Sequence, residues 1–474
     1  MQTHAAQYEF TGRREDRRLV TGRGKYTDDW NLPGQLHAVF VRADRAHAIL
    51  RAVKTDAAMR HPGVVAVVTS RDIANEGWKN PGTMVSYPGR GKPLQIPHHS
   101  MLATERVRYV GEEIAMVVAQ TAAIARDAAE LVEVDYQDLP AAVDVEAAMK
   151  PGAAQLYPDI VNNVCFDYDY GNEAATAEAF KAAHHITRLR AESQRISGNP
   201  MELRGAIAAH DQASDSFDLY LPHQGMTMMR GGLIGIMGLT PDKLRIRAID
   251  VGGGFGPRSG VYAEFPVLLW AAKKLGRPIK WQSTRNEIFM TEFPGRALVL
   301  NGELALDRNG KFLAIRMQWT CDQGAYLSGA GPFINTLNAA MTITGCYTIP
   351  VAYGRHQLVL TNTVPTTAYR GAGRPDMAYI VERLVDQAAT ETGIDRIELR
   401  RRNAVPKAAF PYKTPCNNVE YDSGDYATLL NEAMSKCDWA GFPARRAASA
   451  AKGKLRGIGM GLFVEPAEIG KAHV

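Results

Sequence analysis

Cysteine is scarce in this 474-residue chain, and its spacing excludes two kinds of site. The five cysteines are scattered and form no C-x-x-C pair; they are Cys165, Cys321, Cys346, Cys416 and Cys437. The spacing excludes an internal iron–sulfur cluster of the usual pattern and a four-ligand zinc site. An odd, sparse set of thiols is typical of reduced cysteines, so we expect a cytoplasmic protein.

Long apolar runs and blocks of like charge are also missing. No segment approaches the ~20 uninterrupted apolar residues of a membrane span, and the polar start of the chain lacks the apolar core of a signal peptide. The formal net charge is +5 without a basic run, so nucleic acid is not an expected partner. The length predicts two to four domains with substantial cores.

Alternating strand-like and helix-like segments divide the chain. Residues 1–20 are polar and are expected to form a loose lead-in. Residues 21–146 predict a small α/β domain, with strands at 36–41, 64–69, 112–119 and 132–136 and a helix at 121–131. Residues 147–163 contain two prolines and a glycine and form the predicted linker.

The larger domain, residues 164–474, is predicted to be mixed, which makes the fold class α+β. Its expected strands are 184–193, 205–210, 216–221, 244–249, 297–306, 312–321 and 355–360. Its expected helices are 178–183, 226–237, 262–275 and 375–392.

A glycine-rich bend at residues 250–258 (DVGGGFGPR) stands between a predicted strand and a predicted helix. Without Cβ atoms, successive N–H groups can approach a ligand and form an anion-binding concavity, while Phe255 projects into what the loop surrounds. The glycine spacing matches neither the dinucleotide fingerprint nor a P-loop. A tight structural turn without a ligand is an equal alternative.

A second bend, at residues 366–375 (TTAYRGAGRP), also joins a strand to a helix. It presents Arg370 and Arg374, and arginine is suited to bidentate contacts with phosphate or other oxyanions. The two bends could therefore converge on one anionic cofactor. The alternative is that Arg370 caps a helix or pairs with a surface acid.

Three stretches, 250–256, 271–281 (AAKKLGRPIKW) and 368–375, resemble the molybdenum-binding large subunit of the xanthine dehydrogenase/aldehyde oxidase family. The resemblance runs from about Gly12 to the C-terminus and includes 42–48 (RADRAHA) and 136–140 (YQDLP). It implies an α/β-hammerhead domain at 21–146, followed by the N-terminal half of a molybdopterin-binding domain.

The resemblance also implies a cofactor and partners. The cofactor would be molybdopterin, as the cytosine dinucleotide, with 2Fe–2S and FAD on partner subunits. The reaction would oxidise an aldehyde or N-heteroaromatic carbon with oxygen derived from water, and the cofactor would supply the difficult chemistry.

The resemblance assigns the site residues by motif, with Gln224 and Phe255 at the catalytic centre. Gln224 matches the family glutamine that hydrogen-bonds an oxygen ligand of molybdenum; read alone, it is an ordinary polar loop residue. The implied cofactor contacts are Gln224, Gly253, Gly254, Phe255, Gly256, Arg370, Gly371 and Ala372, and no metal ligand is expected from the chain.

Departures from the family pattern narrow the substrate. Purine-oxidising members have an acid, an arginine and an aromatic residue where this chain has Ser259, Asn338 and Ala372. Without these groups a purine's polar edge cannot be paired in the same way. Carbon-monoxide-oxidising members have a copper-binding cysteine where this chain has Gly371, so the copper site is not expected.

The family's general base is a glutamate in a Gly-Glu motif that this chain does not contain. Glu465 and Glu468 stand in a different motif, and we expect them to be solvated or structural. Loss of a general base costs a factor of ~10²–10⁴ in rate. We therefore expect the isolated chain to be inactive and to need a C-terminal molybdenum-subunit partner. The alternatives are a truncated, non-catalytic remnant or scaffolding subunit, and an unrelated nucleotide-binding module, which the failed fingerprint disfavours.

Overall fold

Strands from two separate stretches of the chain form one seven-stranded sheet. The structure, a computed structural model, describes residues 12–13, 15–83, 85, 88–248, 250–416 and 419–465. In spatial order the sheet contains β11 (Leu244–Arg247), β10 (Ser216–Tyr220), β9 (Gly205–Asp211), β12 (Ile279–Gln282), β1 (Leu36–Arg42), β5 (Glu113–Ala119) and β3 (Val64–Thr69). Strand β12 joins the two stretches, because it pairs parallel to β1 and antiparallel to β9.

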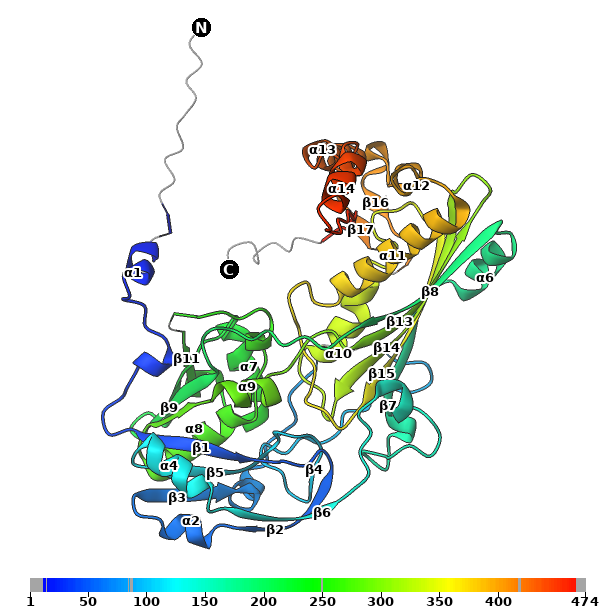
Figure 1. Cartoon of the computed structure of the whole chain (residues 1–474). Coiled ribbons are helices and arrows are strands. Elements are labelled where there is room, and N and C mark those ends of the chain that lie inside the picture. Colours follow the sequence, from blue (N-terminus) through cyan, green and yellow to red (C-terminus); the bar gives the residue numbers. More distant parts are fainter. Residues whose placement is uncertain are drawn as a thin grey trace, which may run out of the picture.

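A second lobe is built around a five-stranded sheet (Figure 1). Its order is β7 (Val164–Gly171), β15 (Val351–Leu360), β14 (Phe312–Gly324), β13 (Leu298–Leu306) and β8 (His185–Ser193). Helix α11 (Arg374–Thr392) packs on β8 and β13, and α6 (Glu173–Lys181) packs on β14 and β15. The predicted apolar face of α11 is buried, which confirms that helix and its orientation.

Helices also cover the first sheet. Helix α8 (Glu264–Leu275) packs on β9 and β12, α4 (Ala122–Ala129) on β1 and β5, and α7 (Met226–Met237) on β11. The remaining strands form two small sheets. One contains β4 (Arg106–Val107), β2 (Ala48–Lys54) and β6 (Glu133–Asp138), and the other contains β16 (Tyr412–Lys413) and β17 (Glu420–Tyr421). The remaining α-helices are α1 (Asp16–Val20), α2 (Asp56–Arg60), α3 (Ser70–Ile73), α5 (Val145–Ala148), α9 (Arg285–Thr291), α10 (Gly331–Phe333), α12 (Arg396–Asn403), α13 (Tyr426–Lys436) and α14 (Phe442–Ala450).

The predicted mixed α/β architecture is confirmed, and some details of the prediction are wrong. Residues 16–20 of the expected loose lead-in form α1, and the predicted helix 178–183 begins earlier because Asn172 caps α6 through Ala175 N–H. Strand β11 ends at Arg247, and Ile249 lies outside the described residues. The predicted linker is packed, since Leu156 and Ile160 are buried in the core of the second lobe. The domain boundaries stay a prediction.

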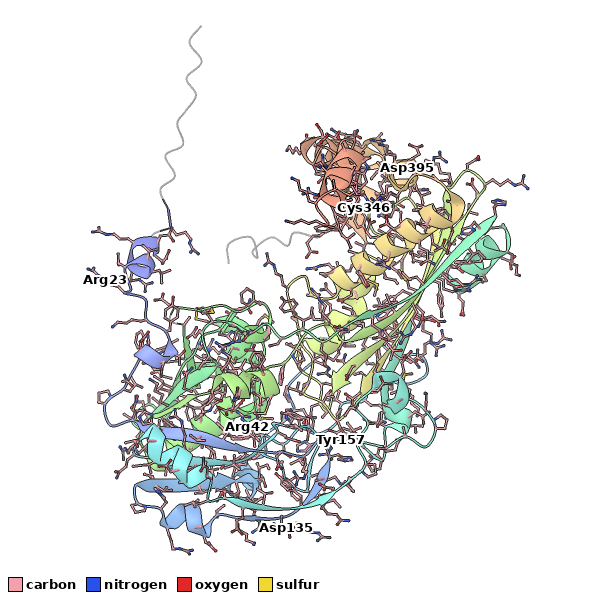
Figure 2. All side chains as sticks on the ribbon, in the orientation of Figure 1. Arg23, Arg42, Asp135, Tyr157, Cys346 and Asp395 are labelled. Atoms are coloured by element: carbon pink, nitrogen blue, oxygen red, sulfur yellow. The ribbon has the colours of Figure 1, made fainter. Side chains whose placement is uncertain are left out.

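A buried ionic cluster connects elements of the first lobe, which is the lobe built around the seven-stranded sheet. Arg42, labelled in Figure 2, is 7% exposed, and its guanidinium contacts carboxyl oxygens of Glu113 of β5 (2.7 Å), Glu264 of α8 (2.8 Å) and Glu287 of α9 (2.9 Å). Arg204 also pairs with Glu264, at 2.6 Å. One guanidinium therefore ties β1 to three other elements.

We expect Glu113 to make the fold less stable as the pH rises from about 4.5 to about 8. Burial, and then repulsion from Glu264, raises the pKa of Glu113 from 4.5 to about 8. The folded chain thus holds a proton that the unfolded chain releases, so this stabilisation is complete below the unfolded pKa and is lost as the pH rises through the folded one. The unfolding temperature should fall by roughly a few °C between pH 6.5 and 8.5.

Calorimetry of the wild-type chain and of Glu113→Gln tests this expectation. The variant has no proton to release, so its unfolding temperature should fall less over the same interval. Burial lowers the pKa of His99 and of His223 to about 4, and these groups therefore change stability only below about pH 6.5. Equal slopes for the two proteins would contradict the role given to Glu113.

Candidate functional site

The first glycine-rich bend lies between β11 and α8 and has a backbone that requires glycine. Gly253 and Gly256 have φ angles of 112° and 110°, and Phe255 itself has φ 54°. These values lie in the left-handed region, which residues with a Cβ rarely adopt. Phe255 is 43% exposed, so the bend presents an aromatic ring at the surface of the chain.

The second bend lies between β15 and α11 and repeats this geometry. Gly371, Ala372 and Gly373 have φ angles of 86°, 53° and 86°. A Cβ on Gly373 would lie 2.4 Å from the carbonyl oxygen of Ile334, so only glycine fits there. Asn338, from a π-helical segment (Ile334–Asn338), donates its Nδ2–H to Ala372 O at 2.6 Å.

The two bends touch each other. The N–H of Arg370 donates to the carbonyl oxygen of Phe255 at 2.9 Å. A Cβ on Gly256 would lie 2.4 Å from Ala368 O, so the two backbones are in direct contact. The structure therefore brings together two segments that are more than one hundred residues apart in the sequence.

Gln224 joins the same cluster from the segment between β10 and α7. Its Oε1 accepts a hydrogen bond from the N–H of Gly256 at 2.7 Å. A Cβ on Gly254 would lie 2.3 Å from Gln224 Cδ, so the side chain rests on the bare backbone. Gln224 and both bends thus form one site, in which the binding roles of the individual residues stay predictions.

Several hydrogen-bond donors of this site have no acceptor. Among the described residues, none accepts from the backbone N–H of Gly253, Gly254, Phe255 or Gly371. The Arg370 side chain is exposed and has no hydrogen-bond or ion-pair partner within the described part of the chain. Free N–H groups in left-handed turns form a concavity for anions, and Arg370 contributes a positive charge from the bend that contacts Phe255.

Three residues considered for substrate or base roles have structural partners within the chain. The hydroxyl of Ser259 donates to Gly256 O at 2.6 Å. Glu465 pairs with Arg374 at 2.6 Å, which fits the structural role expected for it. Asn338 accepts from Arg374 Nη1 at 3.1 Å as well as holding Ala372, so it braces the second bend. Glu468 lies outside the described residues.

The sequence did not predict that two arginines, Arg258 and Arg296, brace the bends through hydrogen bonds to the backbone. Arg258 is 2% exposed; its Nη2 donates to Glu202 O at 2.7 Å and its Nε to Glu292 at 3.1 Å. Arg296 donates to Arg370 O at 2.7 Å. Arg258 ends the first glycine-rich motif, but its bracing role depends on contacts with distant parts of the chain, and no motif or periodicity marks Arg296.

One cavity of the surface does not coincide with this site. A cavity of about 540 Å³ lies at Arg106, Arg108, Tyr157 and Tyr326, and none of its lining residues belongs to either bend. Figure 2 places Tyr157 between the two lobes. Among the described residues there is no group of three or more His, Cys, Asp or Glu placed to hold a metal ion. Within the same residues, no helix has the length and apolar character needed to cross a membrane.

Comparison with protein families gives two matches, which together cover most of the chain. Residues 156–404 match the molybdopterin cofactor-binding domain. Residues 21–140 match the a/b hammerhead domain of aldehyde oxidase and xanthine dehydrogenase. Both bends and Gln224 lie within the first match.

Individual relatives agree with these matches. The chain is 33% identical to the carbon monoxide dehydrogenase large chain of Hydrogenophaga pseudoflava, over 95% of this chain and 57% of the relative. It is 31% identical to the 6-hydroxypseudooxynicotine dehydrogenase complex subunit gamma of Paenarthrobacter nicotinovorans, over 97% and 57%. The chain therefore spans about half the length of the curated relatives it matches.

A solved structure has the same fold. Quinoline 2-oxidoreductase from Pseudomonas putida 86 superposes with a TM-score of 0.86 at 31% identity. The superposition covers 93% of this chain and 55% of that chain. The similarity therefore extends across both lobes.

Proposed function

Because this chain belongs to the molybdenum-binding large subunits of the xanthine dehydrogenase/aldehyde oxidase family, we propose that it is the part of a molybdenum hydroxylase that holds one side of the cofactor. The enzyme would oxidise an aldehyde or an N-heteroaromatic carbon with oxygen derived from water. The observation that carries the proposal is the direct contact between the two bends, which gathers the free N–H groups and Arg370 at one place.

The residues of the site fit an anionic pterin cofactor. The bare backbone at 253–254 lets a ligand approach the N–H groups closely, and Arg370 provides a bidentate donor for a phosphate or another oxyanion. We propose molybdopterin in its cytosine dinucleotide form. When bound, this cofactor would supply the redox chemistry of the reaction.

The chain's own residues would bind the cofactor and orient the substrate. Gln224 keeps its Oε1 on Gly256 N–H and leaves its Nε2 as a donor toward the cofactor. Phe255 would form an apolar wall that excludes water and positions a flat substrate. Gly253, Gly254, Gly256, Gly371 and Ala372 would contribute backbone surface and N–H donors, as the family resemblance implies.

The substrate proposal follows from the groups at the bends. Ser259 and Asn338 are engaged in local hydrogen bonds, and Ala372 has no ring to stack on a purine. Gly371 provides no thiolate for copper, although some relatives are carbon monoxide dehydrogenases. The relatives named for 6-hydroxypseudooxynicotine and for quinoline favour an N-heteroaromatic compound, with aldehydes as the second class.

The complete enzyme would need components beyond these 474 residues. We propose that the general base and the facing wall of the site come from sequence equivalent to the rest of the relatives' length, on a C-terminal partner polypeptide. Electrons would leave through a 2Fe–2S subunit to an FAD subunit, in the cytoplasm. The alternative proposal is a non-catalytic remnant or scaffolding subunit that keeps the fold without holding cofactor.

Replacement of Arg370 by alanine tests the cofactor assignment. The chain is co-produced with its genomic neighbours in a host that makes the cofactor, and molybdenum per purified complex is measured by mass spectrometry. Arg370→Ala removes a charged contact worth about 1.5–3 kcal/mol, so we expect retention of molybdenum during dialysis to fall about 10- to 100-fold. Dye-linked oxidation of aldehydes and N-heteroaromatics should fall in parallel.

Arg383→Ala is the matched control. Arg383 is an exposed arginine of α11 outside the site, with no partner among the described residues. Its removal should change neither molybdenum content nor activity. Molybdenum-free wild-type complexes would favour the scaffolding alternative, and unchanged retention in Arg370→Ala would contradict the role of the second bend.

A further inference from the structure

Glu202 holds the first bend and the N-terminal segment with one carboxylate. Its Oε2 accepts from the N–H of Gly252 at 2.7 Å. Its Oε1 accepts from the N–H and the hydroxyl of Thr27, at 3.0 and 3.1 Å. The backbone N–H of Glu202 donates to Gly252 O at 3.1 Å, so Gly252 is bonded through both its N–H and its C=O.

The N-terminal segment is itself firmly attached. Arg18 forms a bidentate ion pair with Asp250, and the N–H of Lys25 donates to the same carboxylate at 2.7 Å. Lys280 of β12, only 6% exposed, donates to Asp28 O at 2.7 Å and to Trp30 O at 2.9 Å. The segment is thus fixed to the first sheet and reaches the start of the bend.

All three groups that contact the Glu202 carboxylate are hydrogen-bond donors: the N–H of Gly252 and the N–H and hydroxyl of Thr27. A carboxylate has only acceptors and can satisfy them together, whereas a carboxamide of the same shape must direct an N–H at one of these N–H or O–H groups. The next three residues, Gly253, Gly254 and Phe255, carry the free N–H donors of the site. Their orientation depends on the backbone at Gly252, which Glu202 fixes.

We propose that Glu202 is a positioning residue, whose carboxylate orients the anion-binding N–H groups of the first bend by bonding Gly252 and Thr27 at once. Both carboxylate oxygens are already engaged by Gly252 and Thr27. Glu202 acts through the bend, and the N-terminal segment behind it is the anchor. The proposal deepens the proposed function, on which its consequence for the cofactor rests.

Hydrogen exchange of the cofactor-free chain tests the positioning directly. In Glu202→Gln, the amide of Gly252 should exchange about tenfold faster than in wild type, because its charged hydrogen bond is lost. The amides of residues 253–255, which have no acceptor within the described part of the chain, should exchange rapidly in both proteins. Peptides from the five-stranded sheet should be unchanged. Exchange at Gly252 equal to wild type, or acceleration spread evenly over the chain, would overturn the proposal.

Glu391→Gln provides the matched control. Glu391 stands at the opposite end of α11 from the second bend, and its carboxylate also accepts from a threonine hydroxyl, Thr187, at 2.7 Å. It should leave exchange at Gly252 at the wild-type rate. If Glu202→Gln does not fold, Thr27→Val decides: it removes one bond to Glu202, and a two- to threefold acceleration at Gly252 supports the proposal, while none overturns it.

Molybdenum content gives the second measurement. In complexes made in a cofactor-producing host, Glu202→Gln should retain at least fivefold less molybdenum than Glu391→Gln at a similar unfolding temperature. Equal molybdenum in the two variants would overturn the effect on the cofactor. If wild type also lacks molybdenum, the proposed function fails, and hydrogen exchange alone still decides whether Glu202 positions the bend.

Discussion

Gly256→Ala should separate the two bends and abolish molybdenum binding. The added Cβ would lie 2.4 Å from Ala368 O and 2.7 Å from the carbonyl carbon of the same residue. The backbone φ of 110° adds strain for any residue with a side chain. A left-handed conformation costs about 1–3 kcal/mol and overpacking about as much again, so something must move.

The adjacent contacts determine what moves. Gly256 N–H holds Gln224, and the Phe255 carbonyl holds Arg370, so a displaced Gly256 loosens the predicted ligand groups together. We expect molybdenum per complex and substrate oxidation to fall at least 100-fold, with a decrease of several °C in unfolding temperature. Mass spectrometry and dye reduction measure the first two, and calorimetry the third.

Gly235→Ala is the control for this substitution. Gly235 lies within α7, has no atom within 4 Å of an added Cβ and does not adopt a positive φ. Alanine there should be neutral or stabilise the chain by about 0.5–1 kcal/mol. If Gly256→Ala kept wild-type molybdenum content, the bends would not form one binding surface.

Arg42→Met should cause the largest loss of stability. The substitution keeps an apolar stem but leaves the carboxylates of Glu264 and Glu287 without their shared cation. Removing one partner of a buried ion pair costs about 3–5 kcal/mol, because an uncompensated charge remains in the interior. We expect the free energy of unfolding, measured in urea, to fall by about this amount.

The pH dependence of Arg42→Met gives a second signature. Without Arg42 the buried carboxylates should bind protons at higher pH than in wild type, so the folded-state pKa rises and stability is lost more steeply as pH increases. The variant should therefore be least stable at pH 8. Arg45→Met is the control, since the Arg45 pairs with Asp44 and Asp138 are exposed and worth at most about 1 kcal/mol. Equal losses in both variants would contradict the importance of burial.

Local signals explain what the sequence predicted well. The strand-to-helix glycine bends were predicted because a cluster of glycines indicates a backbone with positive φ angles or close contacts, whatever the neighbouring residues are. The helix of residues 375–392 was predicted from its apolar period and its flanking Pro375 and Gly393, and α11 has these limits within one residue. The convergence of the bends was a hypothesis, which the contact of Arg370 with Phe255 supports.

Long-range pairing explains what the sequence did not predict. Strand β2 has a mostly half-buried pattern without clear alternation, so its period was not recognised. The role of Glu202 depends on a residue 50 positions away, Gly252, and on Thr27, 175 positions away. Glu202 lies in an irregular segment, and the residues next to it in the sequence do not indicate these long-range contacts. The same holds for Asn338, whose partners belong to the second bend.

The place of β12 between β9 and β1 has a consequence for synthesis on the ribosome. Strand β1 gains its parallel neighbour only after residues 279–282 have been translated, when more than half of the chain has been made. At roughly 5–20 residues per second, the apolar edge of β1 waits on the order of ten seconds or more without a partner. An open edge of this kind is a template for association between nascent chains until the later strand covers it.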